Sequence, residues 1–398
     1  MQVEADSGAK THGLDGMLVE PDWPPLSLDE VCGLLRYYPS LAAPTKLLTV
    51  SPRPFSAASV VATEREQVFV KRHHLAVRDP EGLREEHRFM AHLRAGGVAV
   101  PRVIAAASGE TAIKQGEWVY EVHETPPGLD LYEDAISWTP FRSAAHAHSA
   151  GRVLARLHLA SQGYDAPARL RRQLVAGFTI FASDDPAVEF DRYVAARPAL
   201  SAYLRTRKCR DEALSLLQPF HAEILPLLPA LAPLWTHNDW HASNLMWSGD
   251  GADAQAVAVI DFGLADQTNA VHDLAHAIER NIVGWLALVN DPHHPEEVPV
   301  HYDDLFSLLE GYRSVRPLSR AECRALAPMT ALCHAEFALS ETDYFLSVLR
   351  SEDKARMACE GYLVAHAQWF REPGSKLLEA LRGWATQQET SANGPVAR

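Results

Sequence analysis

The sequence has 398 residues, enough for two packed lobes or two to three ordinary domains, and its 47% hydrophobic and 22% charged residues exclude a mostly disordered chain. The 37 lysines and arginines against 51 aspartates and glutamates give a net charge of −14, which disfavours nucleic acid and anionic membranes as partners. Five scattered cysteines without a CxxC pair, no signal-peptide pattern and no apolar run of membrane-spanning length together favour a cytoplasmic protein.

The first part of the chain alternates strand and helix patterns. Residues 1–25 lack periodicity and are predicted to be a flexible arm. Ser27 and Glu30 then have the spacing of a capping box, which begins a short helix. Strand patterns follow at 46–61, 67–72, 100–104 and 117–122, and a helix pattern runs from Asp79 and Pro80 to the glycines at 96 and 97. This succession predicts an N-terminal α+β lobe at 26–125.

Helical patterns dominate the rest of the chain. They cover residues 150–159, 211–228, 273–289, 303–313, 322–350 and 354–370. One predicted pair of strands, 245–247 and 256–260, interrupts them and is joined by a turn-rich segment. We therefore expect a mainly helical lobe at 126–385, followed by a polar, frayed tail at 386–398.

The most informative motif runs from His237 to Asn244 and is followed by Asp261-Phe262-Gly263. Folding the intervening strands into a hairpin brings Asn244 and Asp261 together at its base. An amide oxygen and a carboxylate are hard ligands that suit Mg²⁺. Asp239 lies in the loop just before the hairpin, where it can take a proton from an attacking hydroxyl. Aspartates and asparagines near turns are also common turn formers, but the order of loop, hairpin and Asp-Phe-Gly favours a phosphotransfer site.

A second pair of residues in the N-terminal lobe carries opposite charges. Lys71 lies in the middle of a predicted strand, and Glu86 falls on the inward face of the following helix with Leu83 and Met90. A carboxylate on an apolar face needs a partner, and Lys71 is the natural one. A Lys–Glu pair over a cleft is the arrangement with which kinases bind phosphates. A solvated lysine and an edge glutamate are the competing interpretation.

These motifs resemble the aminoglycoside phosphotransferase/choline kinase-like family, which comprises small-molecule kinases with a protein-kinase-like fold. The resemblance covers roughly residues 40 to 370. Its strongest motifs are His237–Asn244 and Ile260–Gly263, and its weaker ones lie at 68–71, 84–86, 100–103, 154–158 and 273–275. It implies a bilobal α+β fold, with a small N-terminal lobe of antiparallel sheet plus helix and a larger, mainly helical C-terminal lobe.

The resemblance implies ATP and Mg²⁺ as cofactors and a small-molecule substrate as partner, while the oligomeric state stays open. Asp239 corresponds to the catalytic base, and Asn244 and Asp261 correspond to the metal ligands. Lys71 corresponds to the residue that holds the nucleotide phosphates, and Glu86 to the residue that orients it.

Other nucleotide contacts are implied in the same way. The segment 53–59 corresponds to the loop over the phosphates; it contains no glycine, but Ser56 and Ser59 offer hydroxyl donors. The segment 120–123, with Glu121 and Val122, corresponds to the hinge whose backbone receives adenine.

The acceptor site in this family is a groove lined by helices of the C-terminal lobe. Its carboxylate candidates here are Asp266, Glu279, Glu310, Glu336 and Glu341, and its aromatic candidates are Trp138, Trp240, Trp285 and Tyr312. An acidic pocket would suit an amine-bearing acceptor such as an amino sugar, aminoglycoside, amino alcohol or hydroxy amino acid. Each carboxylate also has the simpler interpretation of a solvated helix charge.

Two alternative functions remain from the sequence. His237, Asp239 and His241 are spaced as ligands of a metal-dependent hydrolase, although no HExxH or CxxC motif accompanies them. A non-catalytic kinase-like binding module is suggested by the glycine-free loop and by Asn238, which stands where the family usually has glycine. Asparagine tolerates a positive φ, so the loop need not be disrupted.

Overall fold

The computed structural model describes residues 11–12, 18–19, 21–51, 53–169 and 173–392. After two short paired strands, β1 (Thr11–His12) and β2 (Leu18–Val19), comes helix α1 (Leu28–Leu35), which begins at the predicted capping box. Five strands then form one antiparallel sheet in the order β3-β4-β5-β7-β6. They are β3 (Pro44–Leu47), β4 (Ala57–Thr63), β5 (Gln67–His74), β6 (Ile113–Gln115) and β7 (Trp118–Glu124).

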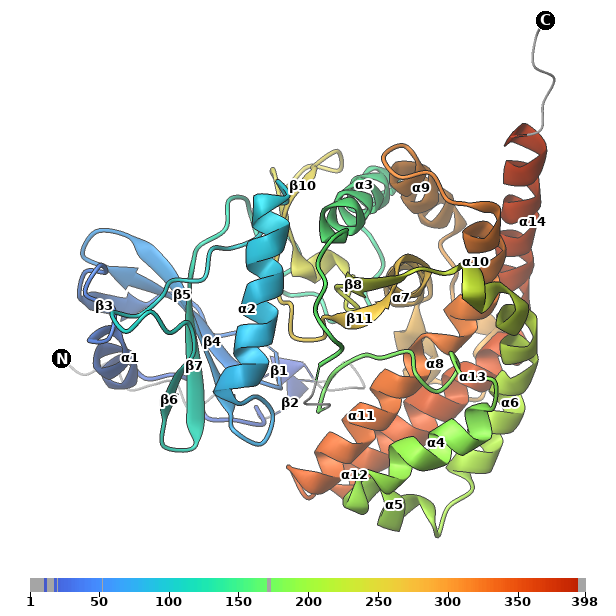
Figure 1. Cartoon of the computed structure of the whole chain (residues 1–398), viewed down its shortest axis with the longest axis horizontal. Helices are drawn as coiled ribbons and strands as arrows, with labels where there is room; N and C mark the ends of the chain where they lie inside the picture. Colours follow the sequence, from blue (N-terminus) through green and yellow to red (C-terminus); the bar gives the residue numbers. More distant parts are fainter. Residues whose placement is uncertain (1–10, 13–17, 20, 52, 170–172, 393–398) are drawn as a thin grey trace, which may run out of the picture.

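Helix α2 (Pro80–Ala95) lies between this sheet and the helical region in Figure 1. It begins as predicted, because Asp79 accepts a hydrogen bond from the Gly82 amide and Pro80 needs no amide partner. Its apolar face is buried through Leu83, Phe89, Met90 and Leu93. The predicted strand at 100–104 is reduced to a single bridge between Val103 and His123.

The rest of the chain is mainly helical and also contains two small strand pairs. The helices are α3 (Ala144–Ser161), α4 (Pro186–Ala195), α5 (Pro198–Leu204), α6 (Cys209–Ile224), α7 (Ala270–Ile282), α8 (Trp285–Asn290), α9 (Tyr302–Arg313), α10 (Arg320–Leu332), α11 (His334–Ser347), α12 (Glu352–Arg356), α13 (Ala365–Arg371) and α14 (Ser375–Ala392). A π-helical segment, Met357–Val364, joins α12 to α13. Strand β8 (Pro233–Thr236) pairs with β11 (Asp266–Asn269), and β9 (Leu245–Trp247) pairs with β10 (Ala256–Val259). The predicted α+β architecture is confirmed.

Both predicted flexible ends are wrong where the structure describes them. Within the arm, Asp22 is bound by Tyr344 and Lys354, and the Trp23 ring stacks on His74, so 21–25 pack against the folded chain. Residues 1–10, 13–17 and 20 of the arm lie outside the described residues. At the other end α14 continues to Ala392, where 386–398 was expected to fray, and only 393–398 fall outside the description. None of the described helices is both long and apolar enough to cross a membrane.

The chain passes from the sheet to the helical region at Gly128. This residue has a φ of +105°, and an added Cβ would lie 2.8 Å from the Trp247 carbonyl oxygen in β9. The next residue, Leu129, donates its amide to that same carbonyl at 2.8 Å. The crossover is therefore held close to the β9–β10 hairpin. Position 128 needs glycine both for its positive φ and for this close approach of the two backbones. The hairpin carries the candidate site at its base.

Candidate active site

The loop 237–244 leaves β8 and enters β9, and its first residues have a demanding conformation. Asn238 has a φ of 59°, in the left-handed region where asparagine is tolerated better than most residues. Its side-chain oxygen accepts hydrogen bonds from the hydroxyls of Thr236 and Thr268 at 2.9 and 3.1 Å. The expectation that asparagine can replace glycine here is confirmed, because its amide group is anchored in the β8–β11 pair.

Asp273, near the start of α7, fixes the same loop. Its carboxylate accepts the backbone amides of His237 at 2.9 Å and Asn238 at 2.8 Å, and it is bound by His158 Nε2 at 2.9 Å. His158 in turn contacts the Tyr312 hydroxyl through Nδ1 at 2.7 Å. Burial alone would raise the pKa of Asp273. The combined effect of His158 and His237 outweighs burial, so the pKa of Asp273 is lowered. His158 and Asp273 therefore brace the loop 237–244.

Asp239 is the next loop residue toward the cavity. Its carboxylate lies 3.5 Å from His241 Nε2 and 3.7 Å from Arg280 Nη2, and Asn244 Nδ2 donates to it at 3.1 Å. Burial alone would raise the pKa of Asp239, but His241 and then Arg280 hold it well below its usual range. The carboxylate is therefore ionised near neutral pH and lines the cavity described below.

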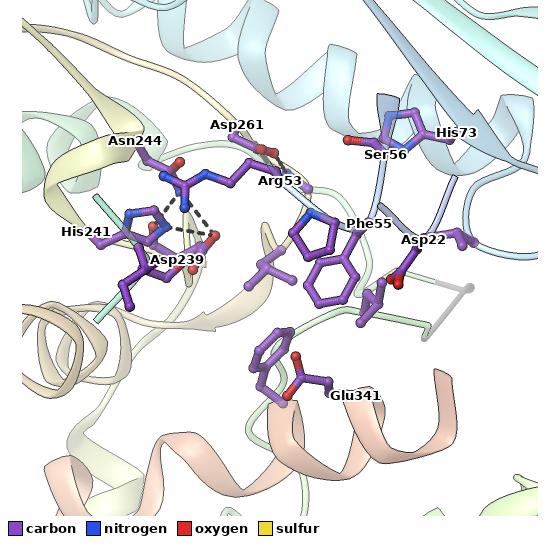
Figure 2. Close-up of a pocket in the computed structure, with 18 of the residues that line it drawn as sticks. Asp22, Arg53, Phe55, Ser56, His73, Asp239, His241, Asn244, Asp261 and Glu341 are labelled. Carbon is purple, nitrogen blue, oxygen red and sulfur yellow. Dashed lines mark hydrogen bonds and ion pairs between the residues drawn. The ribbon is translucent and has the colours of Figure 1, made fainter. Parts of the chain in front are cut away.

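The predicted juxtaposition of Asn244 and Asp261 is confirmed (Figure 2). The Ile260 amide donates to the Asn244 carbonyl at 2.9 Å, which closes the base of the hairpin and sets both side chains on one wall of the cavity. Asn244 donates from Nδ2 to Asp239, so the side-chain oxygen of Asn244 points away from Asp239. Asp261 uses Oδ1 for both Lys71 and the Gly263 amide. An amide oxygen and a second carboxylate oxygen suit a hard divalent cation.

Lys71 on β5 bonds Asp261 at 3.0 Å, so it spans the gap between the sheet and the hairpin. The predicted pairing with Glu86 is wrong. Glu86 accepts Arg78 Nε at 2.8 Å and also binds Arg169, whose side chain is fully buried. Helix periodicity predicted the burial of Glu86 but not its partners, because Arg169 lies far away in the sequence. Arg78 also donates to the Gly263 carbonyl, so this cluster supports the Asp-Phe-Gly turn rather than the lysine.

Glu86→Gln is expected to destabilise the fold by roughly 3–5 kcal/mol, because it leaves buried Arg78 without its countercharge and leaves buried Arg169 with only Glu85, at 3.7 Å. Urea unfolding followed by tryptophan fluorescence measures this loss. Glu81→Gln on the same helix is the matched control, since its partners Arg84 and Arg88 are exposed, and its effect should stay within about 0.5 kcal/mol. Equal stability of the two variants would contradict the structural role of Glu86.

The loop between β3 and β4 reaches the cavity through Arg53, Phe55 and Ser56, which lie in the predicted segment 53–59. Arg53 donates to the Ser243 hydroxyl and, at 3.2 Å, to the Ala135 carbonyl, and Phe55 packs on Tyr344 with ring centroids 5.3 Å apart. Ser56 lines the cavity as predicted. Ser59 does not: it is buried in β4, and its hydroxyl donates to the Thr49 carbonyl at 2.6 Å. The sequence signal for this contact with the cavity was the arginine, Arg53, in a loop that lacks glycine.

The predicted hinge at 120–123 is wrong in position. Glu121 and Val122 lie inside β7, where β5 pairs on one side and the Ile104 amide donates to the Val122 carbonyl at 2.7 Å on the other. Their backbone is therefore engaged, and the crossover between the two regions begins after Glu124. The Glu121 side chain is buried among His73, His87 and His123, whose Nε2 atoms lie 3.0, 2.7 and 2.8 Å from its oxygens.

Most of the predicted acceptor residues do not line the cavity. Asp266 accepts the Arg169 and Gln267 amides, Glu279 contacts His366, Glu310 is exposed on α9, and Glu336 accepts the Ile180 amide at 2.6 Å. Among the aromatic candidates Trp138 lines it, whereas Trp240, Trp285 and Tyr312 are fully buried.

The cavity has a volume of about 300 Å³ and is walled by both regions of the chain. Glu341 lines it as predicted, on α11. Sequence reasoning missed Arg280, which also lines the cavity from α7. Its signal was a charged residue seven positions after Asp273, on the same helix face.

The hydrolase interpretation has no geometric support. His237 Nε2 lies 3.0 Å from the Ile260 carbonyl, and its Nδ1 accepts the Asp239 amide at 3.3 Å, so its ring nitrogens are used within the loop. Over the described part of the chain, His87, Glu121 and His123 are the group of three ligand-type residues whose ligand atoms lie within 4.8 Å of one another. That group lies away from the proposed His237, Asp239 and His241 cluster.

Comparison with known proteins also indicates a phosphotransferase. The model of the phosphotransferase enzyme family matches residues 54–318. A homoserine kinase of Agrobacterium fabrum is 25% identical over 245 residues, which are 60% of this chain and 61% of that protein. An uncharacterized protein of Deinococcus radiodurans is 26% identical over 288 residues, 71% of this chain and 73% of that one.

Solved structures share the fold at lower sequence identity. A microcompartment-associated aminopropanol kinase has a TM-score of 0.56 at 18% identity, over 86% of this chain and 95% of that chain. The amicoumacin kinase hAmiN, in complex with AMP-PNP, Ca²⁺ and Ami, has a TM-score of 0.54 at 15% identity, over 86% and 93%.

Proposed function

This chain belongs to the phosphotransferase enzyme family, and we propose that it uses ATP and Mg²⁺ to phosphorylate a hydroxyl of a small, amine-bearing molecule. As a member of that family it is a phosphotransferase with an alcohol group as acceptor. The observation that carries the proposal is the meeting of Asp239, Asn244 and Asp261 on one cavity with Lys71. These groups come from the catalytic loop, the hairpin and the sheet, and they supply a base, two oxygen ligands and a cation.

In the proposed reaction Asp239 accepts the proton of the acceptor hydroxyl late in a loose transition state. Its low pKa suits that timing, because a weak base takes the proton only once the oxygen has begun to bond to phosphorus. The new bond joins the acceptor oxygen to the γ-phosphorus, and the bond from that phosphorus to the β–γ bridging oxygen breaks, so that ADP leaves with the electron pair.

The charges that develop on the phosphates need fixed countercharges. Asn244 and Asp261 would hold Mg²⁺, which supplies charge neutralisation across the β- and γ-phosphates when bound. Burial alone would lower the pKa of Lys71, but the carboxylates of Asp261 and Glu121 outweigh burial and raise this pKa. The ammonium group therefore remains charged in the cavity. Arg53, whose guanidinium reaches the catalytic loop, adds a second cation from the loop above the phosphates.

An amine-bearing acceptor is supported by Glu341 on the cavity wall and by the homoserine kinase among the relatives. The test is a coupled assay of ADP release over amino sugars, aminoglycosides, amino alcohols and hydroxy amino acids, with thermal shifts measured in parallel. We expect acceptor-dependent ADP release with one class and a phosphate ester as product. ADP release that ignores every acceptor would contradict the proposal, and nucleotide binding without any turnover would favour the non-catalytic module.

A further inference from the structure

Arg280 is a buried cation that lines the cavity, and two of its donor atoms lack hydrogen bonds within the described chain. It is 4% exposed, and neither Nε nor Nη2 has a hydrogen-bond partner among the described residues. The nearest carboxylates lie at ion-pair distances, with Asp239 at 3.7 Å and Glu279 at 3.5 Å. A guanidinium stays charged under all ordinary conditions, and a buried charge without hydrogen bonds is costly. Its planar donors fit a carboxylate in two-pronged geometry.

The other cations that line the cavity already have partners. Within the described chain Lys71 bonds Asp261, Arg78 bonds Glu86, Arg53 bonds Ser243, and Lys354 bonds Asp22 at 2.5 Å. Arg280 has carboxylates at 3.5 and 3.7 Å but no hydrogen bond from Nε or Nη2 to a described residue, and it is therefore the lining cation best placed to receive an external anion. Because it borders Asp239, such an anion would lie only a few atoms from the hydroxyl that loses its proton.

Glu341 on α11 supplies the opposite charge. It is 2% exposed, lines the cavity, and its Oε2 atom has no hydrogen-bond partner in the part of the chain that the structure describes. Figure 2 shows its carboxyl group pointing up from the helix toward the cavity. Burial raises the pKa of Glu341 to about 8, and an ammonium group beside it would restore the ionised form. The cavity lining also includes the apolar side chains of Trp138, Phe337 and Met357.

We propose that the acceptor is a small hydroxy amino acid, whose carboxylate binds Arg280 and whose ammonium group binds Glu341. This inference rests on the proposed kinase function and narrows its acceptor to a zwitterion. A plain amino alcohol would leave the Arg280 donors unpaired, and a hydroxy acid without an amine would leave Glu341 unpaired. Sites built to bond a charged group discriminate strongly against analogues that lack it.

The test compares acceptors that differ by one group. L-Homoserine is paired with 3-aminopropan-1-ol, which lacks the carboxylate, and with 4-hydroxybutanoate, which lacks the amine; L-serine is paired with ethanolamine. We expect kcat/KM to favour the amino acid of a pair by about 10- to 100-fold, as one charge-assisted interaction implies. An amino alcohol that equals or exceeds its amino acid in both pairs would overturn the inference.

Variants assign the preference to the two residues. In Arg280→Gln the preference for homoserine over aminopropanol should fall toward one, and in Glu341→Gln the preference over hydroxybutanoate should fall. Arg316→Gln is the control, because that arginine pairs with Glu322 outside the cavity and should change neither ratio. Equal losses on all acceptors in Arg280→Gln would instead assign Arg280 to positioning Asp239 and overturn the inference.

Failure of this inference is separable from failure of the kinase proposal. If no acceptor supports ADP release, the proposed function fails. If aminopropanol and ethanolamine are phosphorylated as well as the amino acids, only the zwitterion inference fails. Should Arg280→Gln not fold, the acceptor ratios of the unaltered protein and of Arg280→Lys, which keeps the charge but loses the planar donors, still decide the question.

Discussion

Replacing Asp239 by asparagine is expected to lower phosphate transfer by about 10²- to 10⁴-fold, because the variant loses the group that accepts the hydroxyl proton. Nucleotide binding should persist, since asparagine keeps the shape and an acceptor oxygen for Asn244. The measurement is single-turnover phosphate transfer to the acceptor found in the screen, together with nucleotide affinity by calorimetry.

Asp253→Asn is the matched control for this experiment. Asp253 is exposed in the turn between β9 and β10 and does not line the cavity, so its substitution makes the same chemical change at a distance. Transfer by Asp239→Asn at the rate of the control would show that Asp239 is not the base. A loss of nucleotide affinity in step with the rate would instead place Asp239 in binding.

Asp261→Ala is expected to remove the Mg²⁺-dependent part of ATP binding. The parent protein should bind ATP more tightly in Mg²⁺ than in EDTA, and in the variant the ratio of these two dissociation constants should approach one. The reason is electrostatic: without Asp261 the cation loses its carboxylate ligand, while repulsion between that carboxylate and the phosphates also disappears. The lost repulsion affects binding in both buffers, so the ratio of the two dissociation constants reports the contribution of the metal alone.

Calorimetric titrations in the two buffers give that ratio, and Asp253→Ala again serves as the control. Loss of Asp261 also frees Lys71, which bonds it at 3.0 Å, so the folded fraction should be checked by unfolding before affinities are compared. A variant that retains the parent ratio would move the metal site away from Asp261 and favour the interpretation as a non-catalytic module.

The hairpin at the candidate site was predictable because its determinants are local. Asn238, Asn244 and Asp261 lie at fixed positions around two short strands, and a hairpin has few ways to close. The same holds for the start of α2, where Asp79 and Pro80 define the cap within the sequence itself. Local chemistry of this kind is visible in a single sequence.

Partner choice across the chain was not predictable. Periodicity placed Glu86 inward, but only folding brings Arg169 to it instead of Lys71. The acceptor carboxylates were mostly mispredicted for a related reason. Glu336 and Glu341 lie on the same helix but point in different directions, so Glu336 accepts backbone amides at 179–180 and Glu341 lines the cavity. Helix faces are set by packing with distant segments, which composition and spacing do not encode.

The contacts of Arg53 and Phe55 have a kinetic meaning. They join the β3–β4 loop of the sheet to Ser243, in the loop before β9, and to Tyr344 on α11, so one short loop is held at two points of the helical region beside the cavity. A substitution that loosens the Phe55 packing is therefore expected to change the rates of ligand entry and product release without touching the reacting atoms.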